Sequence, residues 1–134
     1  MLDPHGALIY TMVIVSATES HLSESELQVI GDTIGHLPVF RGFDRERLPA
    51  LLNACAEALA RENGLETTLK EISAALPVRL HETAYAISCD LVAADGKANQ
   101  EELQILELIR HRLKVDRLTA AAIERGARAR FQTL

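Results

Sequence analysis

The chain has 134 residues, of which 48% are apolar and 25% are charged, and its formal net charge is −5. These values fit one globular domain with a sizeable core and exclude a disordered chain. No apolar run reaches the ~18–20 residues that cross a bilayer, so we expect no transmembrane segment.

Charge is unevenly distributed along the chain. Residues 108–134 hold seven Lys and Arg residues against two acidic ones, whereas residues 1–107 hold seven against seventeen. The acidic bulk would repel a nucleic acid, and no aromatic residues interleave the basic ones for base stacking. We therefore expect no nucleic-acid partner. The basic residues could meet phosphate or an acidic protein, or could simply complement helix C-termini.

Apolar residues follow helical spacing throughout, and no segment shows the period-two alternation of a strand. The sequence therefore predicts an all-α fold of about seven helices in a single domain spanning residues 1–134. The expected helix starts are Asp3-Pro4, Ser23, Asp44 or Pro49, Leu65, Pro77, Asn99 and Asp116. The expected apolar stripes include Leu8, Ile9, Met12 and Val13 in the first helix, Leu27, Ile30, Ile34 and Leu37 in the second, and Leu103, Leu106, Ile109 and Leu113 in the sixth.

One acidic turn occurs twice in the chain. Residues 19–30 align with residues 95–106 at an offset of 76, which pairs Glu19 with Asp95 and Glu26 with Glu102. A helix, turn, helix, loop and helix occur at residues 4–63 and again at 78–130. We expect these two halves to pack about a pseudo-twofold axis, because each would otherwise expose an apolar face.

Helix capping accounts for part of each acidic turn. Ser23 with Glu26, and Asn99 with Glu102, have the spacing of a capping box, in which each side chain bonds the other residue's backbone N–H. Capping does not explain Glu19 and Asp95, which lie four residues before each cap.

A divalent-cation site is the other interpretation of these turns. If the two turns face each other, Glu19, Glu26, Asp95 and Glu102 would bring carboxylates together near the axis. Oxygen ligands of this kind suit Ca²⁺ or Mg²⁺, and the spacing is not that of an EF-hand. The sequence predicts no organic cofactor.

The stretch from Leu91 to Ile105, with Asp95, Gly96 and Glu102, resembles the TerB-like family associated with bacterial tellurite resistance. The resemblance covers nearly the whole chain, because that family is all-helical and internally duplicated. It implies a non-catalytic, cytoplasmic bacterial protein of tellurite and chemical-stress resistance that works with protein partners in a stress-response complex. It also implies that Asp95 and Glu102, with Glu19 and Glu26 as their first-half equivalents, hold a divalent cation. The first half departs from the pattern, since Thr18-Glu19-Ser20 replaces an Ala-Asp-Gly.

No motif of a hydrolase, a phosphate-binding loop or a metalloprotease is present, so we expect no enzyme. Cys55 and Cys89 lie in apolar helical patterns and are expected to be buried free thiols. Two alternatives remain: a structural interaction domain whose acidic turns only cap helices, and, less favoured, a metal-dependent hydrolase. Val39, Phe40 and Phe43 could cover the core or form a homodimer patch.

Overall fold

The fold is all-helical, as the sequence predicts. The computed structural model describes residues 1–16, 22–94 and 99–134. Within these ranges it has seven α-helices, three short 3₁₀ helices and no strand. The α-helices are α1 (Pro4–Ser16), α2 (Glu24–His36), α3 (Leu48–Ala60), α4 (Gly64–Ala75), α5 (His81–Ala94), α6 (Gln100–Arg112) and α7 (Arg117–Arg130). The 3₁₀ helices are Pro38–Phe40, Arg45–Arg47 and Val78–Leu80.

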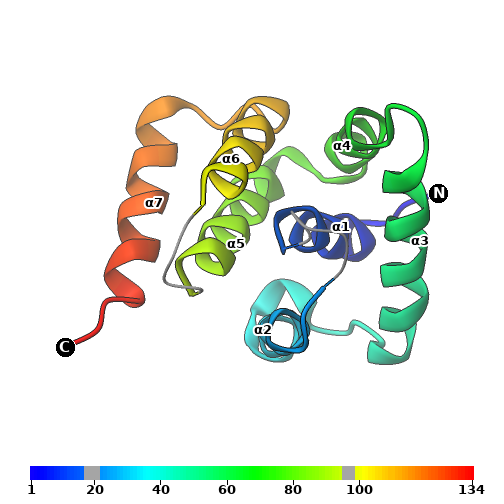
Figure 1. Cartoon of the computed structure of the whole chain (residues 1–134), viewed down its shortest axis with the longest axis horizontal. Coiled ribbons are helices and arrows are strands. Elements are labelled where there is room, and N and C mark those ends of the chain that lie inside the picture. The colour runs from blue at the N-terminus through cyan, green and yellow to red at the C-terminus, as the bar shows by residue number, and fades with distance from the viewer. Residues whose placement is uncertain (17–21, 95–98) are drawn as a thin grey trace.

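Helix α1 is the centre of the molecule. Every residue from Gly6 to Val15 is buried, because α1 contacts α2, α3, α4, α5 and α6. In Figure 1 it lies in the middle, with α3 and α4 on one side and α5, α6 and α7 on the other. The amphipathic stripe expected from the sequence therefore includes too few of the buried residues of α1. A helix that is surrounded by other helices is apolar on all sides.

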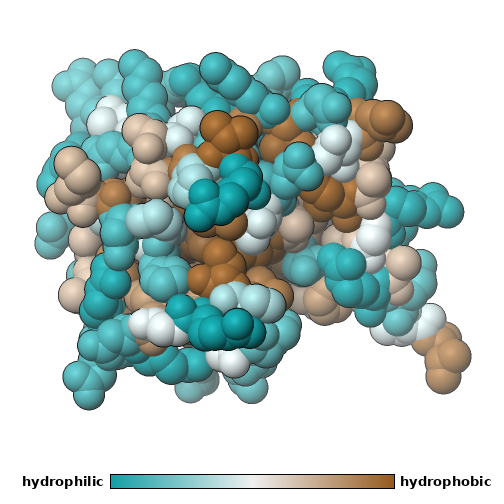
Figure 2. Space-filling view, turned by 180° about the vertical axis from the view of Figure 1, so that it is seen from behind, coloured by the Kyte–Doolittle hydropathy of each residue, from teal (hydrophilic) through white to brown (hydrophobic). Residues whose placement is uncertain are grey.

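The second central helix is α5, which packs against α1, α2, α6 and α7. Its buried face includes Ala84, Ile87 and Leu91, as the helical spacing predicts. Figure 2 shows apolar side chains reaching the surface in the middle of the opposite face, with hydrophilic side chains around them. No α-helix in the described part of the chain is long and apolar enough to cross a membrane.

Two predicted stripe positions are wrong. Leu27 of α2 and Leu103 of α6 are 39% and 48% exposed, respectively. Both lie in the first turn of their helices, and the core begins one turn later at Ile30 and Leu106, which are buried. The apolar residues of the 37–43 loop, by contrast, cover the core: Phe40 is buried, and Val39 and Phe43 pack against it.

Candidate functional site

The acidic turn before α2 contains a complete capping box. The hydroxyl of Ser23 accepts a hydrogen bond from the backbone N–H of Glu26 at 3.1 Å. In return, a carboxylate oxygen of Glu26 accepts from the backbone N–H of Ser23 at 2.9 Å. The sequence prediction for this helix start is confirmed, and it gives Glu26 a structural role.

The turn before α6 repeats this arrangement with Asn99 in place of Ser23. The Asn99 side-chain oxygen accepts from the N–H of Glu102 at 2.8 Å, and the Glu102 carboxylate accepts from the N–H of Asn99 at 3.1 Å. Glu102 is only 8% exposed, whereas Glu26 is half-buried. The two equivalent glutamates therefore occupy the same helix position in environments of different polarity.

The other two predicted ligands, Glu19 and Asp95, lie outside the described residues. Among the residues that the structure does describe, no group of three or more His, Cys, Asp or Glu side chains could hold a metal ion. The four-carboxylate site remains a prediction from the sequence.

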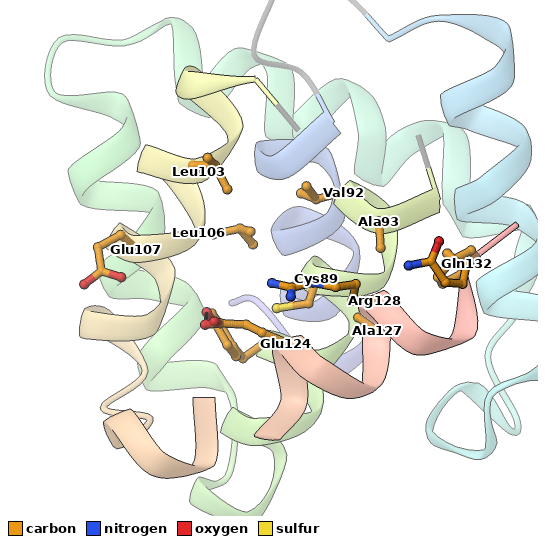
Figure 3. Close-up of a pocket in the computed structure, with 12 residues that line it drawn as sticks. Cys89, Val92, Ala93, Leu103, Leu106, Glu107, Glu124, Ala127, Arg128 and Gln132 are labelled. Carbon is orange, nitrogen blue, oxygen red and sulfur yellow. Dashed lines mark hydrogen bonds between the residues drawn. The ribbon is translucent and has the colours of Figure 1, made fainter. Parts of the chain in front are cut away.

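A groove lies between α5, α6 and α7, and the sequence did not reveal it (Figure 3). Its volume is about 580 Å³, which is within the range of small-molecule sites in proteins. Buried side chains of Tyr85, Cys89, Val92, Leu106 and Ala127 line it. Two half-exposed apolar residues, Leu103 of α6 and Phe131 after α7, also line it.

One hydrogen bond crosses the lining of this groove. The hydroxyl of Tyr85 donates to Oε2 of Glu124 at 2.6 Å, which links α5 to α7. Burial, with the hydrogen bond to Glu124, raises the pKa of Tyr85. The phenol therefore stays protonated as a donor at neutral pH.

Both cysteines are buried free thiols, as predicted. Burial raises the pKa of Cys55 and of Cys89 to about 12. A thiol must lose its proton to act as a strong nucleophile or metal ligand, and these two keep theirs at neutral pH. Their surroundings are those of packing residues.

The charged side chains on the rim of the groove differ in their partners. Glu107 accepts from Arg110 at 2.6 Å and lies 3.1 Å from the His111 ring. Arg130, the last residue of α7, lies outside the lining and pairs with Asp90 of α5. Arg128 has no hydrogen bond or ion pair with any residue in the described ranges.

Comparisons with protein-family models, with curated proteins and with solved structures gave no match for this chain. The TerB-like resemblance and the function that it implies therefore stay predictions.

Proposed function

We propose that the chain is a non-catalytic helical domain that binds a divalent cation at its two acidic turns. The observation that carries this proposal is the repetition of one capping box, with Glu at the same position, at the starts of α2 and α6. The two turns follow α1 and α5, helices that contact each other directly. Glu19, Glu26, Asp95 and Glu102 are the proposed ligands.

The pattern of helix contacts supports a duplicated domain. Helix α1 contacts α2 and α3, while α5 contacts α6 and α7 in the same chain order. The cross-contacts also correspond, since α1 touches α6 and α5 touches α2. Helix α4 has no counterpart after α7 among the described residues. We infer two related halves, 4–63 and 78–130, with α4 added to the first.

Helix electrostatics favour a hard cation near each turn. The last carbonyl groups of α1 and α5 carry the negative end of each helix dipole, and free carbonyl oxygens are themselves ligands for Ca²⁺ and Mg²⁺. The acidic side chains that follow add full negative charge. Carboxylates gathered without a cation would repel one another, so a bound cation would stabilise the fold.

The family resemblance supplies the biological setting of the proposal. It places the domain in the cytoplasm of a bacterium, in a stress-response complex with protein partners, in resistance to tellurite and related chemical stress. The absence of a spanning helix from the described residues is compatible with that setting.

The test distinguishes the charge of Glu26 and Glu102 from their role in helix capping. Glutamine at the third helix position still completes a capping box, so Glu26→Gln with Glu102→Gln removes two charges and keeps both caps. We expect Ca²⁺ or Mg²⁺ to raise the melting temperature of the native chain, and this variant to lose the rise. Asp32→Asn with Glu57→Gln, two exposed acids away from the turns, is the matched control and should keep it. An equal rise in both variants would refute the assigned site.

A structural interaction domain is the second candidate function. The formed capping boxes favour it, because they give Glu26 and Glu102 a role that needs no cation. On this hypothesis no cation changes the melting temperature, and Ser23→Ala or Asn99→Ala each lower stability by about 1 kcal/mol. Gln28→Ala, at an exposed position of the same helix beyond its first turn, is the control for Ser23→Ala. A specific cation-dependent rise in the native protein would exclude this candidate.

A further inference from the structure

The ring of His81, the first residue of α5, lies between the C-terminal ends of two other helices. Its Nδ1 atom is 3.0 Å from the carbonyl oxygen of Leu113, which follows α6, and its Nε2 atom is 3.1 Å from that of Leu76, which follows α4. Both leucines are buried. Neither carbonyl accepts another hydrogen bond from the described residues. One half-buried side chain therefore caps both helix ends.

Two carbonyl acceptors need two donors, and this requirement favours the charged form of the ring. A neutral imidazole has one N–H, so its other nitrogen would present a lone pair to a carbonyl oxygen. The doubly protonated ring donates to both oxygens. The ends of α4 and α6 also place the negative ends of two helix dipoles beside the ring, and a cation is favourable at such a place.

No carboxylate is needed to hold the second proton. His81 forms no ion pair in the described part of the chain, and the last turn of α4 has no charged residue. The charged residues on the segments around the ring are Arg79, Glu82, Arg110, His111, Arg112 and Lys114. Arg110 and His111 lie beside Glu107, and Arg112 pairs with Glu66. Arg79, Glu82 and Lys114 are exposed, so solvent screens them.

His5 occupies the corresponding position in the first half of the chain, at the same offset of 76 that relates the two acidic turns. Its Nε2 atom is 2.8 Å from the carbonyl oxygen of Val39. Its Nδ1 atom has no hydrogen-bond partner among the described residues. A neutral imidazole satisfies this single acceptor, so the two histidines differ in the number of protons that their contacts require.

We propose that His81 is a pH-sensitive double cap, a ring that joins the start of α5 to the ends of α4 and α6 while it carries two protons. When the ring releases one proton to solvent, it loses one of the two hydrogen bonds, and one helix end is no longer capped. Because only the protonated ring makes both bonds, the stability that His81 contributes is complete below about pH 6.5, where a histidine of the unfolded chain titrates, and falls as the pH rises. The double cap is independent of the cation proposed at the acidic turns.

NMR of the native chain with ¹⁵N-labelled histidine tests the double cap directly. At pH 5.5 we expect two ring N–H signals for His81, because hydrogen bonds protect both from exchange with water, and at pH 8 we expect one. The carbonyl carbon signal of Leu76 or Leu113 should move over the same pH range. For His5 we expect one protected N–H at both pH values. A single protected N–H on His81 at pH 5.5, or carbonyl signals of Leu76 and Leu113 that do not change with pH, would overturn the proposal.

A pair of glutamine variants measures the effect on stability. His81→Gln removes the titratable group, and the shift of its urea midpoint from that of the native chain should be about twice as large at pH 5.5 as at pH 8, since hydrogen bonds to charged groups are about twice as strong as neutral ones. His5→Gln is the matched control and should shift the midpoint by nearly the same amount at both pH values. Equal shifts for His81→Gln at the two pH values, or a larger shift at pH 8, would contradict a cap that depends on the second proton.

Discussion

The hydroxyl of Tyr85 lies 2.6 Å from Oε2 of Glu124, and this hydrogen bond links α5 to α7, the last helix of the fold. Tyr85 is 1% exposed, so its hydroxyl depends on Glu124 for a partner. The bond also fixes one side of the groove between α5, α6 and α7.

Tyr85→Phe should lower the free energy of unfolding by about 1 kcal/mol, the usual net value of one hydrogen bond. Glu124 is exposed and regains water in the variant, so no larger penalty is expected. The control is Tyr10→Phe, because the Tyr10 hydroxyl has no hydrogen-bond partner among the described residues. Chemical denaturation measures both variants, and an equal loss in the two would contradict the role of the Glu124 bond.

The buried thiols predict a loss of stability at alkaline pH. Burial raises the pKa of Cys55 and Cys89 to about 12, whereas an unfolded cysteine titrates near ~8.5. Each thiol therefore contributes stability that is complete below about pH 8.5 and is lost as the pH rises toward 12. The raised pKa of Tyr85 adds to this loss from about pH 10.

The double variant Cys55→Ala, Cys89→Ala should be less stable than the native chain at pH 7 and should lose less stability between pH 8.5 and 10. Urea denaturation at a series of pH values gives the slope of the free energy of unfolding against pH for the native chain and for the double variant. Identical slopes would show that the thiols do not keep their protons in the folded state.

Two glycine-to-alanine substitutions, one at the turn between α3 and α4 and one within α2, should change the stability in opposite directions. A Cβ on Gly64 would lie 2.4 Å from the Ala58 carbonyl oxygen and 2.6 Å from that of Leu59. These are backbone atoms, so Gly64→Ala forces α3 and α4 apart and should cost about 2 kcal/mol.

Gly31→Ala is the matched control within α2. Its added Cβ would meet only the Arg45 side chain at 3.5 Å, an ordinary contact. Alanine is also the better helix former, so a gain of about 0.5 kcal/mol is expected. Thermal denaturation of the two variants gives opposite signs if α3 and α4 approach as closely as described.

Features set by neighbouring residues could be predicted from the sequence. The caps at Ser23, Asn99 and Asp116 form as expected, because a cap depends on residues only two or three positions away. The buried state of both cysteines also follows from the apolar spacing around them.

Features set by distant segments could not be predicted in this way. The all-round burial of α1 depends on five other helices, and the exposure of Leu27 and Leu103 depends on where their helices leave the core. The contacts of the His81 ring likewise could not be predicted from its sequence neighbours. Its nitrogens lie 3.0 Å from the Leu113 carbonyl and 3.1 Å from that of Leu76, two segments far apart in sequence.

The candidate site contains both kinds of feature, some set by neighbouring residues and some by segments distant in sequence. The positions of Glu26 and Glu102 follow from local capping and were predictable. The groove and the Tyr85–Glu124 bond join α5, α6 and α7, which no local motif connects. Tyr85, a polar aromatic in an otherwise aliphatic helical pattern, was the one sequence signal that could have pointed there.

Paramagnetic broadening of amide signals by Mn²⁺ tests the proposed cation site most directly. Sub-stoichiometric Mn²⁺ should broaden the amides of residues 23–26 and 99–102 together and first, and excess Mg²⁺ or Ca²⁺ should restore them. Amides around Glu57 and Glu71, two exposed acids of α3 and α4, should stay sharp. Broadening at only one of the two turns, or equally at Glu57 and Glu71, would contradict a shared site built from the duplicated carboxylates.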